Sequence, residues 1–209
     1  NGIITGNRFY DFKGLNCDAI DLGEQSQNIL ITDNKIYNSS DKGISVGQKS
    51  SADIIDNLIV NCYFGIAVKD SSQAYIRNNT FVNNQYSVVC TEKNYNMGGG
   101  NAVIVNSIFS HSAKADVIKD AKSSVEVSYC LSDVADLAGP DNLFTAPVFN
   151  NPANYNFEIL DHSPCLNSGD PDSNLDSNAT RPDIGADYTF DPDDYPYVDH
   201  KVDKIIINE

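Results

Sequence analysis

One short pattern returns along the first part of the chain: an apolar residue, two residues of any kind, an asparagine, one more residue and a second apolar residue. Its copies are Ile4-Asn7-Phe9, Ile31-Asn34-Ile36, Ile54-Asn57-Ile59, Ile76-Asn79-Phe81 and Val103-Asn106-Ile108, with a weaker copy at Val125-Ser128-Cys130. The polar members are 27, 23, 22, 27 and 22 residues apart, which is one period of about 22 residues with two insertions. A period of this length is typical of solenoids, in which each repeat is one coil that stacks on its neighbours.

Apolar and polar residues alternate within each copy, which predicts short β-strands. So short a repeat cannot bury an apolar face alone, whereas coils stacked about 4.8 Å apart share strand hydrogen bonds and one core. Asparagine suits the corner of a coil, because it tolerates the left-handed conformation and its amide can bond to the same residue one coil away. The sequence therefore predicts an all-β fold, a parallel β-helix of about five to six coils. The alternative is a β-sandwich with Asn-rich turns.

Several segments carry a resemblance to a known family. They are Asp18-Ala-Ile-Asp-Leu-Gly23, Asp41-Lys-Gly-Ile-Ser-Val-Gly47, Phe64-Gly-Ile-Ala-Val68, Phe157-Glu-Ile-Leu-Asp-His-Ser-Pro-Cys-Leu-Asn-Ser-Gly-Asp170 and Arg181-Pro-Asp-Ile-Gly-Ala186. The first three resemble coils of the right-handed parallel β-helix in the pectate-lyase-like superfamily, and the last two are similar to the end of many secreted bacterial β-helix proteins. The resemblance implies a right-handed solenoid and an extracellular or cell-surface location in a bacterium, and it is not specific for a reaction.

The chain divides into three parts by composition. We expect β-helix coils over residues 1–133, an irregular C-terminal cap over 134–190, where Gly, Pro, Asp and Asn are dense, and a linker with the start of a further domain over 191–209. The cap would shield the exposed strand edges of the last coil. Two insertions, near residues 13–18 and 92–100, leave the solenoid at turns. Both ends of the sequence resemble cuts through a longer polypeptide, so we expect flanking domains.

The charge of the chain excludes some classes of partner. Fourteen Lys and Arg stand against 29 Asp and Glu, which gives a formal charge of −15. Such a chain repels phosphate backbones and anionic lipid surfaces, which argues against nucleic-acid binding. No apolar run approaches the roughly 18 to 20 residues that span a bilayer, so we expect no membrane insertion.

The first strand of each coil supplies the first candidate site. Alternation directs eight apolar residues inward: Ile20, Leu22, Ile44, Val46, Ile66, Val68, Val88 and Cys90. It directs five others outward, where small residues edged by acids would form a shallow trough for a sugar chain: Asp21, Ser45, Ala67, Val89 and Asp116. Asp18 and Asp21, with Asp41 about one coil away, are candidates for the acid and base of glycoside hydrolysis. The alternative is that they cap turns on a solvated surface.

The chain differs from the polygalacturonases of this fold family in two motifs and resembles its lyases in one group of residues. Polygalacturonases carry a His-Gly and an Arg-x-Lys element, and the chain has neither. Lyases of the family need a basic residue and a cation, often calcium, for proton abstraction beside a uronate carboxylate. Lys69, Asp70 and Arg77 share one coil and are candidates for that site. Arg77 flanks an inward residue and should project outward, but its spacing leaves open whether it reaches the face that holds Lys69.

A separate segment is a candidate calcium loop. Asp170, Asp172, Asn174 and Asp176 place four oxygen-bearing side chains at alternate positions, as a loop around a hard cation requires. The segment lacks the glycine at the sixth position and the glutamate at the twelfth, where Arg181 stands. Calcium is therefore a possible cofactor, and a solvated Asp-rich turn is the alternative.

These observations lead to one functional hypothesis and two alternatives. We expect a secreted or cell-surface β-helix domain that contacts polysaccharide, as part of a larger carbohydrate-active or surface protein. One alternative is a non-catalytic structural stalk or adhesin. The other is a polysaccharide lyase or glycoside hydrolase that acts within this fragment.

Overall fold

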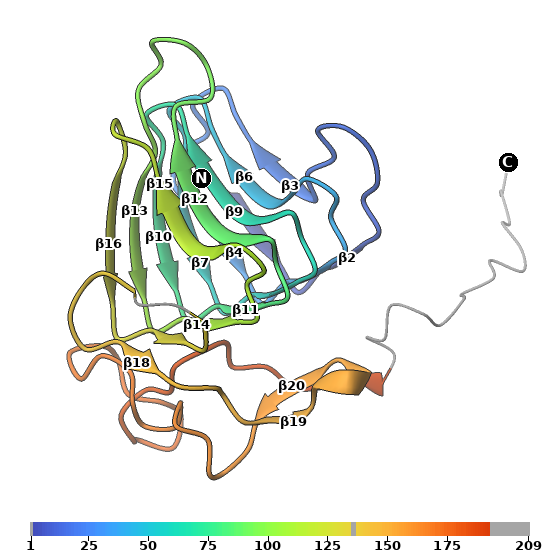
Figure 1. The fold of residues 1–209 in the computed structure, drawn as a ribbon, viewed down its shortest axis with the longest axis vertical. Coiled ribbons are helices and arrows are strands. Elements are labelled where there is room, and N and C mark those ends of the chain that lie inside the picture. The colour runs from blue at the N-terminus through green and yellow to red at the C-terminus, as the bar shows by residue number, and fades with distance from the viewer. Residues whose placement is uncertain (1, 135–136, 193–209) are drawn as a thin grey trace, which may run out of the picture.

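The computed structural model describes residues 2–134 and 137–192. Within them the chain winds as a solenoid of about six turns, whose strands form three parallel sheets (Figure 1). Sheet A contains β1 (Gly2–Thr5), β4 (Ile29–Thr32), β7 (Ser51–Ile55), β10 (Gln73–Arg77), β13 (Asn101–Val105) and β16 (Ser124–Ser128). Sheet B contains β2 (Arg8–Tyr10), β5 (Lys35–Tyr37), β8 (Leu58–Val60), β11 (Thr80–Val82), β14 (Ile108–Ser110), β17 (Leu131–Ser132) and β18 (Leu143–Phe144). Sheet C contains β3 (Ile20–Leu22), β6 (Lys42–Val46), β9 (Phe64–Lys69), β12 (Tyr86–Thr91) and β15 (Ala115–Lys119).

The core is a set of stacked columns inside these three sheets. The eight apolar residues predicted to point inward along sheet C are all buried, which confirms that prediction. In sheet B the rings of Phe81 and Phe109 stack with their centroids 5.2 Å apart. Equivalent residues of successive coils lie one strand spacing apart. Apolar residues at the same position of every coil therefore form a continuous core along the axis.

The corner asparagines form a ladder at the turn from sheet A to sheet B. Asn57 is fully buried, and its Nδ2 donates to the carbonyl oxygens of Ile31 and Ile55, both at 2.9 Å, and to Oδ1 of Asn79 at 3.0 Å. Its Oδ1 accepts from the backbone N–H and the Nδ2 of Asn34, both at 3.0 Å. The Asn57 amide therefore joins its own coil to the coils before and after it and satisfies carbonyl groups inside the corner.

The fifth member of the predicted ladder is wrong by one residue and the sixth by two residues. Asn79 donates its backbone N–H to the hydroxyl of Ser107 at 3.3 Å, and Ser107 donates its own N–H to the thiol sulfur of Cys130 at 3.4 Å. Ser107 and Cys130 thus occupy the corner positions that the sequence pattern gave to Asn106 and Ser128.

The displaced Asn106 has another place in the turn. It adopts a left-handed conformation with φ of 51°, in the position that Asp56 and Asn78 take in earlier coils. Its Oδ1 accepts from the backbone N–H of Asp170 at 2.7 Å and so fixes the cap to the solenoid. Because β13 is apolar at four consecutive positions after its first residue, alternation alone could not fix the register here.

The C-terminal segment covers more than the last coil. β18 extends sheet B, and the hairpin of β19 (Phe149–Asn151) and β20 (Asn156–Ile159) follows it, joined by a 3-10 turn over Pro152–Asn154. Phe157 is buried in one cluster with outward-facing side chains of sheet B, namely Tyr37, Leu58, Val60 and Val82. In Figure 1 these orange strands lie below sheet B. The cap therefore runs along the outer face of that sheet.

Among residues 2–134 and 137–192, no helix is long and apolar enough to cross a membrane. Residues 193–209, which contain most of the predicted linker and further domain, lie outside the described residues. The domain boundaries near residues 133 and 190 stay predictions.

Asp116 was expected on the outer face of sheet C, and the structure corrects this. It pairs in register with Ser87 rather than with Val89 and is 1% exposed. Its Oδ2 accepts a hydrogen bond from the hydroxyl of Ser132, and Ser112 also bonds to the carboxylate. Oδ1 has no partner among the described residues. Burial, aided by the carboxylate of Asp133, raises the pKa of Asp116.

Asp116→Asn is expected to stabilise the protein at neutral pH by about 1 to 2 kcal/mol, because ionising a buried, incompletely bonded carboxyl group opposes folding. A raised pKa in the folded state means that the cost of Asp116 is absent at low pH and grows as the pH rises above its ordinary pKa of 3.8. Urea unfolding at several pH values measures the difference. An equal effect of the substitution at every pH would contradict this explanation.

Candidate functional site

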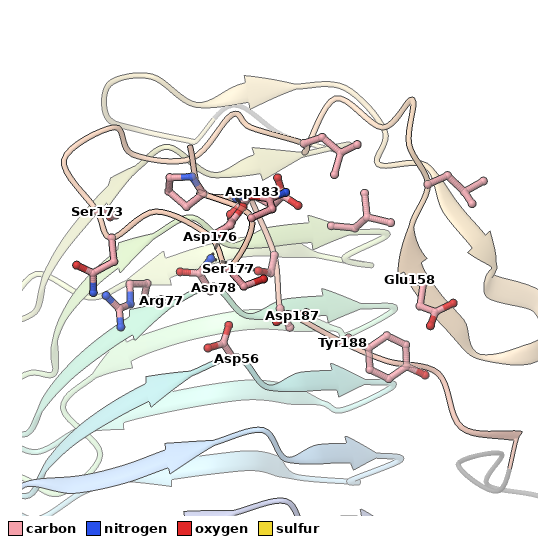
Figure 2. A pocket seen from close by; sticks show the side chains of 18 of the residues that line it. Asp56, Arg77, Asn78, Glu158, Ser173, Asp176, Ser177, Asp183, Asp187 and Tyr188 are labelled. Carbon is pink, nitrogen blue, oxygen red and sulfur yellow. Dashed lines mark hydrogen bonds between the residues drawn. The ribbon is translucent and has the colours of Figure 1, made fainter. Parts of the chain in front are cut away.

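A pocket of about 560 Å³ lies where the ends of the sheet A strands meet the cap. We call it the cap pocket. Its polar lining includes Asp56, Arg77, Asn78, Asn150, Glu158, Asn174, Asp176, Asp183, Asp187 and Tyr188. Figure 2 shows Asp56, Arg77 and Asn78 at the strand ends, facing side chains of the cap loop. The solenoid and the cap each form one wall of the cap pocket, and both contribute polar groups to it.

The solenoid wall is built by the turn that leads into the asparagine ladder. Arg77 ends β10 and points outward, because Ile76 beside it is fully buried in the core. Asn78 follows in the left-handed conformation with φ of 51°. Its Nδ2 donates to the carbonyl oxygens of Asp183 at 3.1 Å and Gly185 at 3.3 Å. These two bonds tie the cap loop to the solenoid beside the pocket.

The cap wall is held by hydrogen bonds between its own acids and its backbone. Oδ2 of Asp176 accepts from the N–H of Asp183 at 3.1 Å. Oε1 of Glu158 accepts from the N–H of Phe190 at 2.9 Å, and this bond is the main reason that the pKa of Glu158 is lowered. Asp176 and Glu158 thus have partly structural roles, and each keeps further acceptor capacity.

The electrostatics of the pocket favour the protonated form of two acids. Burial, with smaller contributions from the carboxylates of Asp33 and Asp187, raises the pKa of Asp56 from 3.8 to about 6. The backbone N–H of Asp187 and the guanidinium of Arg77 oppose this shift. Burial and the carboxylates of Asp183 and Asp187 raise the pKa of Asp176. The pocket is therefore acidic, and an additional negative charge is unfavourable there.

Arg77 provides the cationic group of the pocket. Its Nε is buried and has no hydrogen-bond partner among the described residues, which also contain no ion pair to its guanidinium. The guanidinium carbon lies 5.9 Å from the centroid of the Tyr75 ring. A guanidinium has five N–H donors in a fixed plane, so Arg77 can donate hydrogen bonds to a bound molecule.

The predicted carboxylate group comes together on sheet C, but lysines cover it. Lys42 Nζ lies 3.1 Å from Asp18 and 2.5 Å from Asp41, so both acids are paired. Lys69 Nζ donates to the hydroxyl of Ser45 at 2.8 Å. Burial, together with the neighbouring charges of Lys93 and Lys42, lowers the pKa of Lys69, while Asp18 and Asp21 oppose this.

The expected open trough on sheet C is consequently filled. Ser45 is fully buried and Ala67 is 1% exposed, although both were expected to form an accessible floor. The long lysine side chains lie along the face and bury their methylene groups there. Asp21 alone among the predicted carboxylates of this face is exposed and has no ion pair among the described residues.

The predicted lyase group is divided between two places. Asp70 is 1% exposed, and its carboxylate accepts the backbone N–H groups of Lys93 and Asn94, both at 2.8 Å, so it fixes the loop inserted after β12. Lys69 belongs to β9 of sheet C, whereas Arg77 belongs to β10 of sheet A. The question that the spacing left open is therefore answered: Arg77 lies on a different face from Lys69.

The predicted calcium loop folds as a turn whose members diverge. Oδ1 of Asp170 accepts from the N–H of Asp172 at 3.0 Å, while Asn174 and Asp176 line the cap pocket. Among residues 2–134 and 137–192, no three His, Cys, Asp or Glu side chains are placed to hold a metal ion. Calcium binding stays a prediction, and two of its four candidate ligands belong to the cap pocket.

One comparison with known proteins agrees with this architecture. A family model described as "Right handed beta helix region" matches residues 1–97, which is the part that contains the first coils. No curated protein and no solved structure matches the chain. The fold and the family match together define a right-handed β-helix domain, in agreement with the handedness that the resemblance implied.

Proposed function

We propose that this β-helix domain binds polysaccharide and that the cap pocket receives part of the sugar chain. The observation that carries the proposal is the buried Nε of Arg77, which has no partner among the described residues, in a pocket of about 560 Å³ lined by carboxyl and amide groups. Sugar hydroxyl groups donate to carboxylates and accept from guanidinium and amide groups, so both kinds of lining group find partners.

The charge of the pocket selects among saccharides. Asp56, Asp176, Asp183 and Asp187 line the pocket together with one cationic residue, Arg77, and the whole chain carries −15. A uronic acid would add negative charge where two aspartates already have raised pKa values. We therefore favour a neutral or amino sugar, carried by a polysaccharide outside a bacterial cell.

The test is calorimetry with neutral hexasaccharides derived from cellulose, xylan, mannan and chitin, and with hexagalacturonate in the presence and absence of calcium. At least one neutral hexasaccharide is expected to bind, and Arg77→Ala is expected to weaken it about 10- to 100-fold, as the loss of a charge-assisted hydrogen bond predicts. Lys93→Ala removes an exposed cation that is not part of the pocket lining and is expected to leave the affinity unchanged.

The alternatives give different results in the same experiment. A structural stalk binds no glycan of the panel. A hydrolase releases new reducing ends, and a lyase releases products with an unsaturated sugar that absorbs ultraviolet light. Equal binding by the wild-type protein and Arg77→Ala would remove the cap pocket from the proposal.

A further inference from the structure

A second hollow, of about 520 Å³, lies on the outer face of sheet A, and we call it the sheet A groove. Four of its lining residues stand in one row across adjacent strands: Ser51 of β7, Gln73 of β10, Asn101 of β13 and Ser124 of β16. Neighbouring strands are about 4.8 Å apart, so the row repeats at that interval along the solenoid axis. The repeat of the coils thus becomes a repeat of hydrogen-bonding side chains.

Three of these four side chains are available to a ligand, whereas the hydroxyl of Ser51 already accepts from the N–H of Asn28 and donates to Oε1 of Gln27. No hydrogen bond joins the amides of Gln73 and Asn101 to any described residue, and Ser124 is exposed. The groove is also lined by Ser50, which is 1% exposed and whose hydroxyl has no partner among the described residues. Tyr75, in the next outward position of β10, is 38% exposed.

The composition of the groove indicates an uncharged, polar and linear ligand. Lys49 and Asp53 are the charged residues of the lining, and their charges are opposite. An extended peptide that adds to a sheet needs an open strand edge. Because β7, β10 and β13 each pair with strands on both sides, the groove offers no such edge to a peptide. Amide and hydroxyl groups at regular intervals, with one exposed tyrosine ring, instead suit the hydroxyl groups and ring faces of a neutral sugar chain.

The groove and the cap pocket adjoin on one strand. Gln73, Tyr75 and Arg77 are alternate residues of β10 and therefore face the same side of sheet A. The contact of 5.9 Å between the Arg77 guanidinium carbon and the Tyr75 ring centroid joins the two hollows. We propose that the sheet A groove holds the chain of a neutral polysaccharide across the strands while the cap pocket takes one end of it.

This inference rests on the proposed function. Affinity measured against glycans of increasing length distinguishes binding in the sheet A groove from binding in the cap pocket. The probes are the disaccharide to the hexasaccharide of whichever neutral glycan binds the wild-type protein. Affinity is expected to rise with length in the wild-type protein. Tyr75→Ala and the double variant Gln73→Ala/Asn101→Ala are expected to lose about tenfold in hexasaccharide affinity and to bind the disaccharide normally. Arg77→Ala is expected to weaken every length.

Tyr63→Ala is the matched control, because Tyr63 is 40% exposed and lies outside the groove lining. It is expected to bind all lengths as the wild-type protein does, and thermal unfolding checks that each variant is folded. Unchanged hexasaccharide affinity in Tyr75→Ala and in the double variant, with weak binding by Arg77→Ala, would overturn the groove and leave the cap pocket in place. Failure of every glycan of any length to bind the wild-type protein would overturn both.

Discussion

Asn57→Ala is expected to lower the free energy of unfolding by about 3 to 5 kcal/mol, because it breaks five hydrogen bonds in the interior of the coil corner. The backbone N–H of Asn34 and the carbonyl oxygen of Ile31, both in fully buried residues, lose a partner, and so does the carbonyl oxygen of the half-buried Ile55. Native domains are stable by only about 5 to 15 kcal/mol, so the variant is expected to be marginal. Urea unfolding followed by circular dichroism measures the loss.

Asn101→Ala is the matched control for the ladder. Asn101 begins β13, a central strand of sheet A, and no hydrogen bond joins its side chain to a described residue. Its substitution is expected to change the stability by less than about 0.5 kcal/mol. If Asn57→Ala and Asn101→Ala had the same effect, the ladder would contribute nothing beyond the strands themselves.

Phe157→Ala is expected to have the second large effect, a loss of about 3 to 4 kcal/mol in the free energy of unfolding. The Phe157 side chain is 3% exposed, within the cluster formed by the cap and the outer face of sheet B. Its ring meets those of Phe149 and Tyr155 at centroid distances of 5.4 and 6.1 Å. Since Glu158 follows it in β20 and lines the cap pocket, glycan affinity is expected to fall as well.

The control for the cap is Phe144→Ala, which removes a phenylalanine ring that is 54% exposed on β18. It is expected to cost less than about 1 kcal/mol. Hydrogen exchange distinguishes the two variants further, because Phe157→Ala is expected to expose amides of sheet B beneath the cap. A fully protected sheet B in Phe157→Ala would show that the cap does not depend on this contact.

Much of the fold follows from the sequence, because one repeated pattern determines both the strands and their stacking. Asn7, Asn34, Asn57 and Asn79 stand in one ladder as predicted. The error at Asn106 arose where β13 offers apolar residues in both alternation frames. In such a strand, pairing with neighbouring coils decides the register, and the sequence of the strand alone does not.

The sequence of β8 carries a signal for the cover over sheet B. Leu58-Ile59-Val60 of β8 is apolar at three consecutive positions, and all three residues are buried. A strand that is apolar on both faces is covered on both faces. The pattern therefore indicates that sheet B is covered, although it cannot indicate which segment covers it.

The candidate site could be predicted only in part. Arg77 and Asp176 were each singled out, one for a lyase site and one for a calcium loop, and the structure brings both to the cap pocket. Asp56 and Asn78 were missed, although each directly precedes a ladder asparagine, where an outward polar residue recurs. Asp183 and Asp187 belong to irregular chain without a period, so their meeting with the solenoid depends on tertiary contacts that spacing does not encode.

The most direct measurement is a titration of the isotope-labelled protein with the best-binding neutral hexasaccharide, followed by nuclear magnetic resonance. Chemical-shift changes are expected at Arg77, Asn78 and Asp187 of the cap pocket and at Gln73 and Asn101 of the sheet A groove, with sheet C unaffected. Changes confined to Asp21 and Lys69 on sheet C, or no changes with any glycan of the panel, would contradict glycan binding at the face that sheet A and the cap share.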